Sequence, residues 1–430
     1  MAVRRRRVWM GLLTVSTILA AAPIPGFSAT VLEDLQKEVP ILGWLKGVQA
    51  SGFITGYYTH NLSGAPRGGT TANRRNDFRY NDLEANQFTL DMVELQLLKA
   101  TAADSRLGFG VTANYGSTVR RLESAGFGTK DPLGMTTTNA FDFRQAFLTY
   151  KLPVGNGLDF KFGKFDALVG LELNAMAYNL NTSRGLLYWL TPATHTGVLL
   201  TYPLADTLTA SIGLANGWDV SDDNNQGKTL LASFTATPAK NLSITLGGTY
   251  GAEQGSWGVF GKPSDDIRWI ADLIVAYTPT DKLTVNFTAD TGGEENNPLS
   301  IPPGDDNSWF GVGAIVKAQL TPTCSAAVRA EWVDDDGGAV VFKDFGFPVE
   351  LADGTRTFLN PAFRAFDQKL WEVTLTGEYK FTDNFRTRLE YRHDQSNEKV
   401  FAGRADPVTL DVIGGRKFQD TVSVEFTALF

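Results

Sequence analysis

Apolar and polar residues alternate along most of this chain, in runs of about 9–12 positions. A period of two is typical of β-strands whose two faces meet different surroundings. One run reads LGFGVTANY at residues 107–115, and similar runs recur at residues 208–214, 230–236, 242–246, 269–277, 283–289, 310–320, 324–332 and 371–381. The pattern predicts an all-β protein, which could be a membrane-spanning barrel or a soluble sandwich.

The connections between these runs separate the two architectures. Seven are short turns, six of them rich in Pro, Asp and Asn, at residues 100–105, 152–157, 202–206, 237–241, 278–282, 321–323 and 381–384. Eight are long and mostly polar, at residues 61–85, 117–139, 166–194, 217–226, 251–266, 291–306, 334–367 and 395–414. Strict alternation gathers the turns at one rim and the loops at the other. We therefore predict a transmembrane antiparallel β-barrel of about 16 strands, with short periplasmic turns and long extracellular loops.

The first 29 residues have the pattern of a secretory signal peptide. Four arginines, Arg4 to Arg7, precede an apolar stretch at residues 8–22 and small residues at 26–29. That stretch is short for a membrane anchor, which needs about 20 residues. We predict that residues 1–29 are removed on export, that residues 30–46 form a short periplasmic or lumen-packed segment, and that residues 47–430 form a barrel in the Gram-negative outer membrane.

Composition argues against several other classes of protein. Lys and Arg number 39 against 47 Asp and Glu, a formal net charge of −8, so the basic surplus of a nucleic-acid binder is missing. Cys324 is the only cysteine, and no Cys/His spacing resembles a zinc site. Acidic clusters in the long loops, at residues 222–223, 294–295, 305–306 and 334–336, match no calcium-loop pattern. We predict no metal, no cofactor and no nucleic-acid partner.

The chain ends in an alternating strand with a terminal aromatic residue. Val422, Val424, Phe426, Ala428 and Phe430 alternate with polar residues, which resembles the signal that the outer-membrane assembly machinery reads. Aromatic residues also gather beside the short turns, as at a lipid–water interface: Tyr150, Tyr202, Tyr277, Tyr379, Phe381 and Phe385. The expected partners are the assembly machinery, outer-membrane lipids and lipopolysaccharide. A homotrimer would need a flat apolar patch on the outer face.

Several segments resemble a known family. They read NQFTLDMVEL at residues 86–95, RQAFLTYKLP at 144–153, LDFKFGKF at 158–165, NTSR at 181–184 and TGVLLTYP at 196–203. These are similar to the putative β-barrel porin-2 family of outer-membrane proteins, and the resemblance covers essentially the whole chain after the signal peptide. It implies a single-domain outer-membrane porin, but no particular substrate.

A barrel of about 16 strands is too wide for wall side chains to fill, so water enters and the inward row can be polar. The predicted inward charges are Asp159, Lys161, Asp272, Asp290, Lys317, Arg329, Glu331, Glu372, Glu378, Lys380, Arg386, Arg388, Glu390, Arg392 and Glu425. Their near balance argues against strong charge selectivity from the wall alone. These charges could form a structural ladder, with Glu378 opposite Arg388 and Lys380 opposite Arg386, or a basic track that contacts solutes.

The third long loop, residues 166–194, is unusually apolar for a solvent-exposed segment. We predict that it folds into the lumen and forms the constriction, with Glu172, Asn179, Asn181 and Arg184 as its polar groups. Arg184 facing Glu172 would create a transverse field, although Arg184 could instead simply satisfy loop carbonyls. Lys161 and Lys164, on the preceding strand, are the next candidates.

The predicted function is passive diffusion of small hydrophilic solutes or ions, without enzymatic activity. A barrel hydrolase would need a histidine beside a nucleophile, and His195 with Ser183 is the pair to consider. We expect His195 to be a hydrogen-bonding rim residue instead. The remaining alternative is a non-conducting barrel with an adhesin or structural role, which would have a plugged lumen.

Overall fold

The computed structural model describes residues 47–63, 76–79, 81–82, 84–102, 105–119, 140–223, 225–253, 265–297, 305–337, 348–350, 356–358, 367–401, 404–405, 412–413 and 415–430. The predicted signal peptide and the segment at residues 30–46 lie outside the described residues. Within the described part, no helix is long and apolar enough to cross a membrane.

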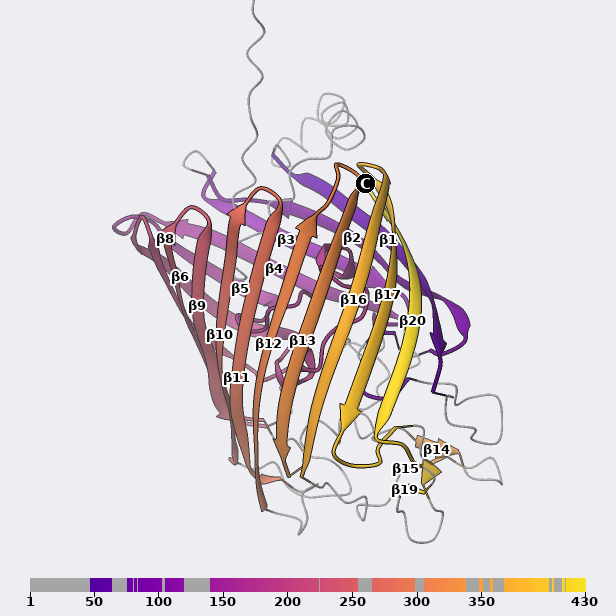
Figure 1. The fold of residues 1–430 in the computed structure, drawn as a ribbon. Helices are drawn as coiled ribbons and strands as arrows, with labels where there is room; N and C mark the ends of the chain where they lie inside the picture. Colours follow the sequence, from indigo (N-terminus) through magenta and orange to yellow (C-terminus); the bar gives the residue numbers. More distant parts are fainter. Residues whose placement is uncertain are drawn as a thin grey trace, which may run out of the picture.

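Sixteen of the described strands close into one antiparallel barrel, as predicted (Figure 1). In ring order they are β1 (Gln49–Asn61), β2 (Gln87–Lys99), β3 (Leu107–Tyr115), β4 (Phe141–Leu152), β5 (Leu158–Asp166), β6 (Thr194–Ala205), β7 (Leu208–Ala215), β8 (Thr229–Ala239), β9 (Leu242–Ala252), β10 (Ile267–Thr280), β11 (Leu283–Asn297), β12 (Asp305–Gln319), β13 (Cys324–Asp336), β16 (Gln368–Thr382), β17 (Phe385–Ser396) and β20 (Phe418–Leu429).

The short elements all lie in long connections. β14 (Pro348–Glu350) pairs with β15 (Arg356–Phe358) between β13 and β16, and β18 (Arg404–Ala405) pairs with β19 (Val412–Ile413) between β17 and β20. Two 3₁₀ turns, η2 (Met176–Tyr178) and η3 (Leu187–Leu190), lie between β5 and β6. The short turns lie at the same rim as the C-terminus in Figure 1, and the strand ends that the long connections join lie at the other. The connection after β11 is shorter than predicted, because β11 continues to Asn297.

The last strand shows how the sequence pattern becomes two faces. On β20, Gln419, Thr421, Ser423, Glu425 and Thr427 are buried inside the barrel. The intervening positions face outward, as does Phe426 at 49% exposure. Such a polar-inside, apolar-outside strand is stable only between lipid and a polar lumen.

The facing of the strands at residues 48–60, 86–99 and 141–152 is ambiguous in the sequence, and bulges account for the second and third of them. Asp91 on β2 has no partner in the register with β1, and Arg144 on β4 has none in the register with β3. On β2 the exposed residues include Phe88 and Leu90 before the bulge but Leu95 and Leu97 after it. One extra residue therefore reverses the phase of the alternation and turns Asp91 into the lumen.

Two strand glycines provide a test of backbone packing. A Cβ added at Gly197 on β6 would lie 2.1 Å from the Leu214 carbonyl oxygen, whereas a Cβ at Gly377 on β16 would meet nothing within 4 Å. We expect Gly197→Ala to destabilise the barrel by about 1–3 kcal/mol, because the backbones must separate. Gly377→Ala should leave stability unchanged or slightly raised. The measurement is the temperature at which heating converts the fast-migrating band of the folded barrel on a gel into the band of the unfolded chain. Equal transition temperatures for the two variants would contradict the packing argument.

Candidate functional site

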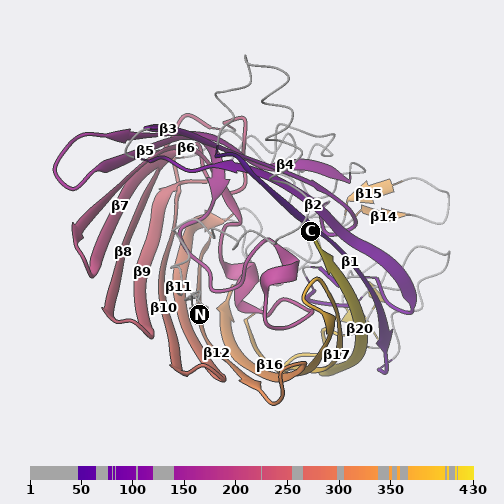
Figure 2. The same ribbon diagram turned by 90° about the horizontal axis from the view of Figure 1, so that it is seen from above.

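The connection between β5 and β6, residues 167–193, lies inside the ring of strands; we call it the inward loop. Figure 2 shows it within the ring, towards β12, β16, β17 and β20. Its apolar side chains pack on the wall: Leu186 and Trp189 join a buried cluster with Trp309, Val333 and Leu370. A second cluster joins η2 to β1 and β2. Burial of apolar surface thus explains why a loop of this composition leaves the solvent.

Wall arginines bind the inward loop through its backbone. Arg329 on β13 is fully buried, and its Nη1 donates to the Ser183 carbonyl oxygen at 2.5 Å and to Glu172 Oε1 at 2.8 Å. Its Nε donates to Glu372 Oε1 at 2.7 Å. One guanidinium therefore joins two wall strands to the loop, as its planar fork of donors permits.

The arginines of β17 repeat this arrangement further along the loop. Arg388 Nη2 donates to the Asn179 carbonyl oxygen at 2.6 Å, while its Nε donates to Glu378 at 3.0 Å. Arg392 donates to the Arg184 carbonyl oxygen. These contacts satisfy loop carbonyls that have no strand partner, which a buried loop requires.

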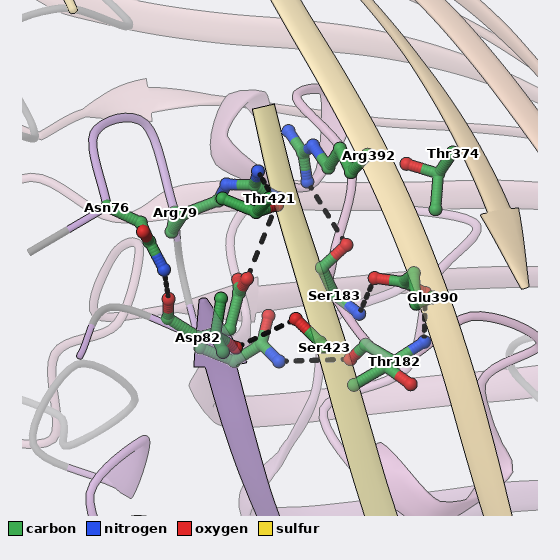
Figure 3. Close-up of polar contacts among 12 residues, drawn as sticks. Asn76, Arg79, Asp82, Thr182, Ser183, Thr374, Glu390, Arg392, Thr421 and Ser423 are labelled. Carbon is green, nitrogen blue, oxygen red and sulfur yellow. Dashed lines mark hydrogen bonds and ion pairs between the residues drawn. The ribbon is translucent and has the colours of Figure 1, made fainter. Parts of the chain in front are cut away.

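Wall carboxylates hold the loop amides in the same way. Glu390 accepts from the backbone N–H of Thr182 at 2.7 Å and of Ser183 at 2.9 Å, as Figure 3 shows. Glu331 accepts from the Leu187 N–H at 3.1 Å. The segment at residues 179–187 is thus fixed to β13 and β17 by charge-assisted hydrogen bonds.

The first long loop also reaches this site, which the sequence did not indicate. Arg79 donates to Asp394 at 2.8 Å and to Thr421 at 2.9 Å, near the Thr182 and Ser183 segment in Figure 3. Asn81 donates from Nδ2 to the Thr182 carbonyl oxygen at 3.0 Å. Burial lowers the pKa of Arg79. No periodicity marks these residues in the sequence, so only the folded path of the chain reveals them.

The predicted pairing of Arg184 with Glu172 is wrong. Arg184 donates to the carbonyl oxygens of Leu173, at 2.9 Å, and Asn174, and its guanidinium lies 4.7 Å from the centre of the Tyr188 ring. Glu172 is instead engaged by Arg329. Arg184 therefore stabilises the loop from within, because nearby carbonyls compete better for a buried guanidinium than a carboxylate already paired.

The other predicted constriction residues are also engaged. Asn179 bonds both backbone groups of Leu173, and Asn181 donates to Thr376 at 2.7 Å. Lys164 donates to both carboxylate oxygens of Asp142 at 2.9 Å. Lys161 lies apart from these, with its ammonium 4.6 Å from the centre of the Phe147 ring.

The wall register agrees with the predicted ladder, since Glu378 lies opposite Arg388 and Lys380 lies opposite Arg386. His195 bonds the Gly217 carbonyl oxygen through Nδ1 at 2.9 Å, whereas Ser183 belongs to the arginine network. His195 is therefore a hydrogen-bonding residue, as expected, and the hydrolase pair considered as an alternative is not formed. Among the described residues, no group of His, Cys, Asp and Glu is arranged to hold a metal ion.

The fold and these contacts define an outer-membrane barrel of the porin class. The chain belongs to the putative beta-barrel porin-2, OmpL-like family, whose model matches residues 47–430. A search of curated proteins found no match.

Solved structures show the same fold at low sequence identity. The anion-selective porin of Comamonas acidovorans has a TM-score of 0.55 at 10% identity, over 89% of this chain and 99% of that one. OprB of Pseudomonas putida has 0.54 at 12%, over 92% and 97%. The trimer form of OmpT, an outer membrane protein of Vibrio cholerae, has 0.52 at 14%, over 89% and 99%. At such identities the likeness concerns the fold alone.

Removing Arg329 should weaken the anchoring of the inward loop. Arg329→Gln leaves Glu172 and Glu372 buried without their shared cation, at a cost of about 3–5 kcal/mol. We expect loss of the compact gel band at a lower temperature and faster proteolysis within residues 171–185. Lys369→Gln is the control, because Lys369 forms an exposed pair with Asp334 and is 60% exposed. Equal effects of the two substitutions would show that Arg329 has no special role.

A buried carboxylate lies where the chain leaves β9. Glu253 accepts from the Trp218 N–H at 2.7 Å and from the Thr229 hydroxyl. Burial raises the pKa of Glu253 from 4.5 to about 7, although Arg268 nearby favours the ionised form. The Glu253 carboxyl therefore binds its proton more tightly in the folded state than in the unfolded state. Protonated Glu253 adds its full contribution to folding stability below about pH 4.5, and this contribution is lost as the pH rises through about 7.

We expect residues 216–221 to exchange their amide hydrogens faster near pH 8 than near pH 5, after correction for intrinsic exchange, because ionised Glu253 destabilises this contact. Glu253→Gln keeps the shape without the charge and should abolish the difference. If the glutamine variant kept the same pH dependence, another group would be responsible.

Proposed function

We propose that this protein is a passive diffusion channel for small hydrophilic solutes or ions, without covalent chemistry. The observation that carries the proposal is the closed ring of sixteen strands with a polar inner row. A ring of this size has a lumen that wall side chains do not fill, and an apolar outer face suits it to a bilayer. Membership of a porin family agrees with transport.

The inward loop is the proposed constriction. Its buried course inside the ring and its fixed backbone support this role, since an element that narrows a passage must hold its position. In this proposal the width of the passage is set by the whole segment at residues 172–187, which is hydrogen-bonded to the wall, rather than by an ion pair between Glu172 and Arg184. Lys161 remains a candidate contact for solutes, because its ammonium lies over aromatic rings and forms no ion pair within 4 Å among the described residues.

The cellular setting follows from the same proposal. Residues 1–29 direct export, residues 30–46 form a periplasmic or lumen-packed segment, and the strand ending at Phe430 is recognised by the assembly machinery. Lipids and lipopolysaccharide surround the outer face. A homotrimer is supported by the trimer form of the OmpT structure, to which the fold is similar.

Single-channel recording in a planar bilayer tests the proposal. The mature protein should give stable conductance steps, and replacing residues 172–187 by a short Gly-Ser linker should enlarge them, because the loop occupies the lumen. Heat-modifiability on gels must first show that each barrel is folded, and boiled protein is the blank. A folded barrel without conductance would overturn the channel and favour an adhesin or structural role.

A further inference from the structure

Lumen-facing charges are unevenly distributed along the barrel axis. Those within about five residues of a short turn or of the C-terminus are Lys151, Asp159, Lys161, Lys317, Glu378, Lys380, Arg386, Arg388 and Glu425. Lys151 and Asp159 pair with each other at 2.9 Å. The others comprise five basic and two acidic groups, so this end of the lumen carries a positive excess.

The opposite imbalance holds further from the turns. On β10 to β17 the acidic residues there are Asp272, Asp290, Glu294, Glu331, Asp335, Glu372, Glu390 and Asp394. The basic residues in the same region are Arg268, Arg329 and Arg392. On these strands the wall therefore has an acidic excess away from the turns, whereas the lumen end near the turns has a basic excess.

Four of the basic residues lie close together, and we call them the basic patch: Lys317 on β12, Lys380 on β16, and Arg386 and Arg388 on β17. Glu378 lies among them, 3.0 Å from Lys317 Nζ, 3.0 Å from Arg388 Nε and 3.5 Å from Arg386 Nε. Three cations thus share this one carboxylate. Glu425 lies 3.5 Å from Arg388 and also attracts Arg386 from a greater distance.

Lys380 increases the imbalance, because it lies directly opposite Arg386 in the register of β16 and β17. Like charges at directly opposed positions destabilise a sheet unless another group screens them. Among the described residues, none forms an ion pair with Lys380. Lys380 is partly exposed between the outward-facing Tyr379 and Phe381, so its own side chain lies on the lumen side. The wall itself does not supply the missing negative charge.

We propose that Lys317, Lys380 and Arg386 form an anion-binding site in the periplasmic half of the lumen, which takes small oxyanions such as phosphate or a carboxylate. An uncompensated positive patch in a polar lumen concentrates anions from solution. Arg386 Nη2 donates to the Ala177 carbonyl oxygen of the inward loop. Arg386 therefore offers its remaining donor and its charge to such an ion, and the two lysines add point charges. Anion binding at this site does not require the protein to be a channel. Only its consequence, that the channel prefers anions to cations, rests on the proposed function.

Selectivity tests that consequence. In a bilayer with a potassium chloride gradient, the wild-type reversal potential should show a preference for chloride. The double variant Lys317→Gln/Lys380→Gln should lose this preference, and so should Lys380→Glu, which lowers the charge of the patch by the same two units. Lys369→Gln is a matched control, because Lys369 lies on the same strand at the other rim and should leave the reversal potential unchanged. A conducting wild type that prefers cations, or a double variant with unchanged selectivity, would overturn the site.

Binding can be tested without conductance. Inorganic phosphate, compared with chloride at equal ionic strength, should raise the temperature at which the folded wild-type barrel is lost, because a ligand of the folded state stabilises it. The double variant should need about tenfold more phosphate for the same shift, the size expected for losing a charged hydrogen bond. Stabilisation without conductance would reject the channel but keep the site. Equal stabilisation of the wild type and the double variant would reject the site, whether or not the barrel conducts.

Discussion

The pairing of β1 with β20 is the contact on which the rest of this barrel depends. It runs from Phe53 opposite Leu429 to Asn61 opposite Thr421, and Gly52 exchanges two backbone hydrogen bonds with Phe430. In a bilayer no water is available to an open strand edge, so an unclosed sheet would leave a row of unpaired amides and carbonyls in lipid. The last residues of the chain are therefore as necessary as the first strand.

Closure with sixteen strands sets the width of the ring. Because the lumen is wide, the loop that enters it needs hydrogen-bond partners from the wall. Wall side chains do not fill a lumen of this size, and the inward loop enters it without a strand ladder of its own. Its carbonyls are met by Arg329, Arg388 and Arg392, and its amides by Glu390 and Glu331. Each buried guanidinium would be costly alone, but its wall carboxylate and its loop carbonyls compensate the charge together.

The sequence predicts the features of this structure that repeat from hairpin to hairpin. It does not predict contacts that depend on how one individual loop runs through the folded barrel. Strand number and rims were predictable because alternation and turn composition recur in every hairpin. The facing of β2 and β4 was ambiguous because Asp91 and Arg144 each reverse the phase at a bulge. Within the inward loop no period exists, so nothing in the sequence identified the carbonyls that Arg184 would meet. Arg79 was missed for the same reason, since its partner Asp394 is more than three hundred positions away.

The positions of the charged residues along the barrel axis modify the expectation, based on their numbers alone, that the wall has no strong charge preference. Nearly equal numbers of basic and acidic residues suggested a wall without strong preference, yet an ion in the lumen responds to nearby charges more than to the total, since screening limits their reach to about 10 Å. On β16 and β17, Lys380 and Arg386 lie near the turn, while Glu372 and Asp394 lie at the other end of the same strands. Because a β-strand rises about 3.3 Å per residue, eight positions separate Glu372 from Lys380 by more than twice that reach. Charges at opposite ends of one strand therefore do not cancel, and each half of the lumen wall carries its own sign of charge.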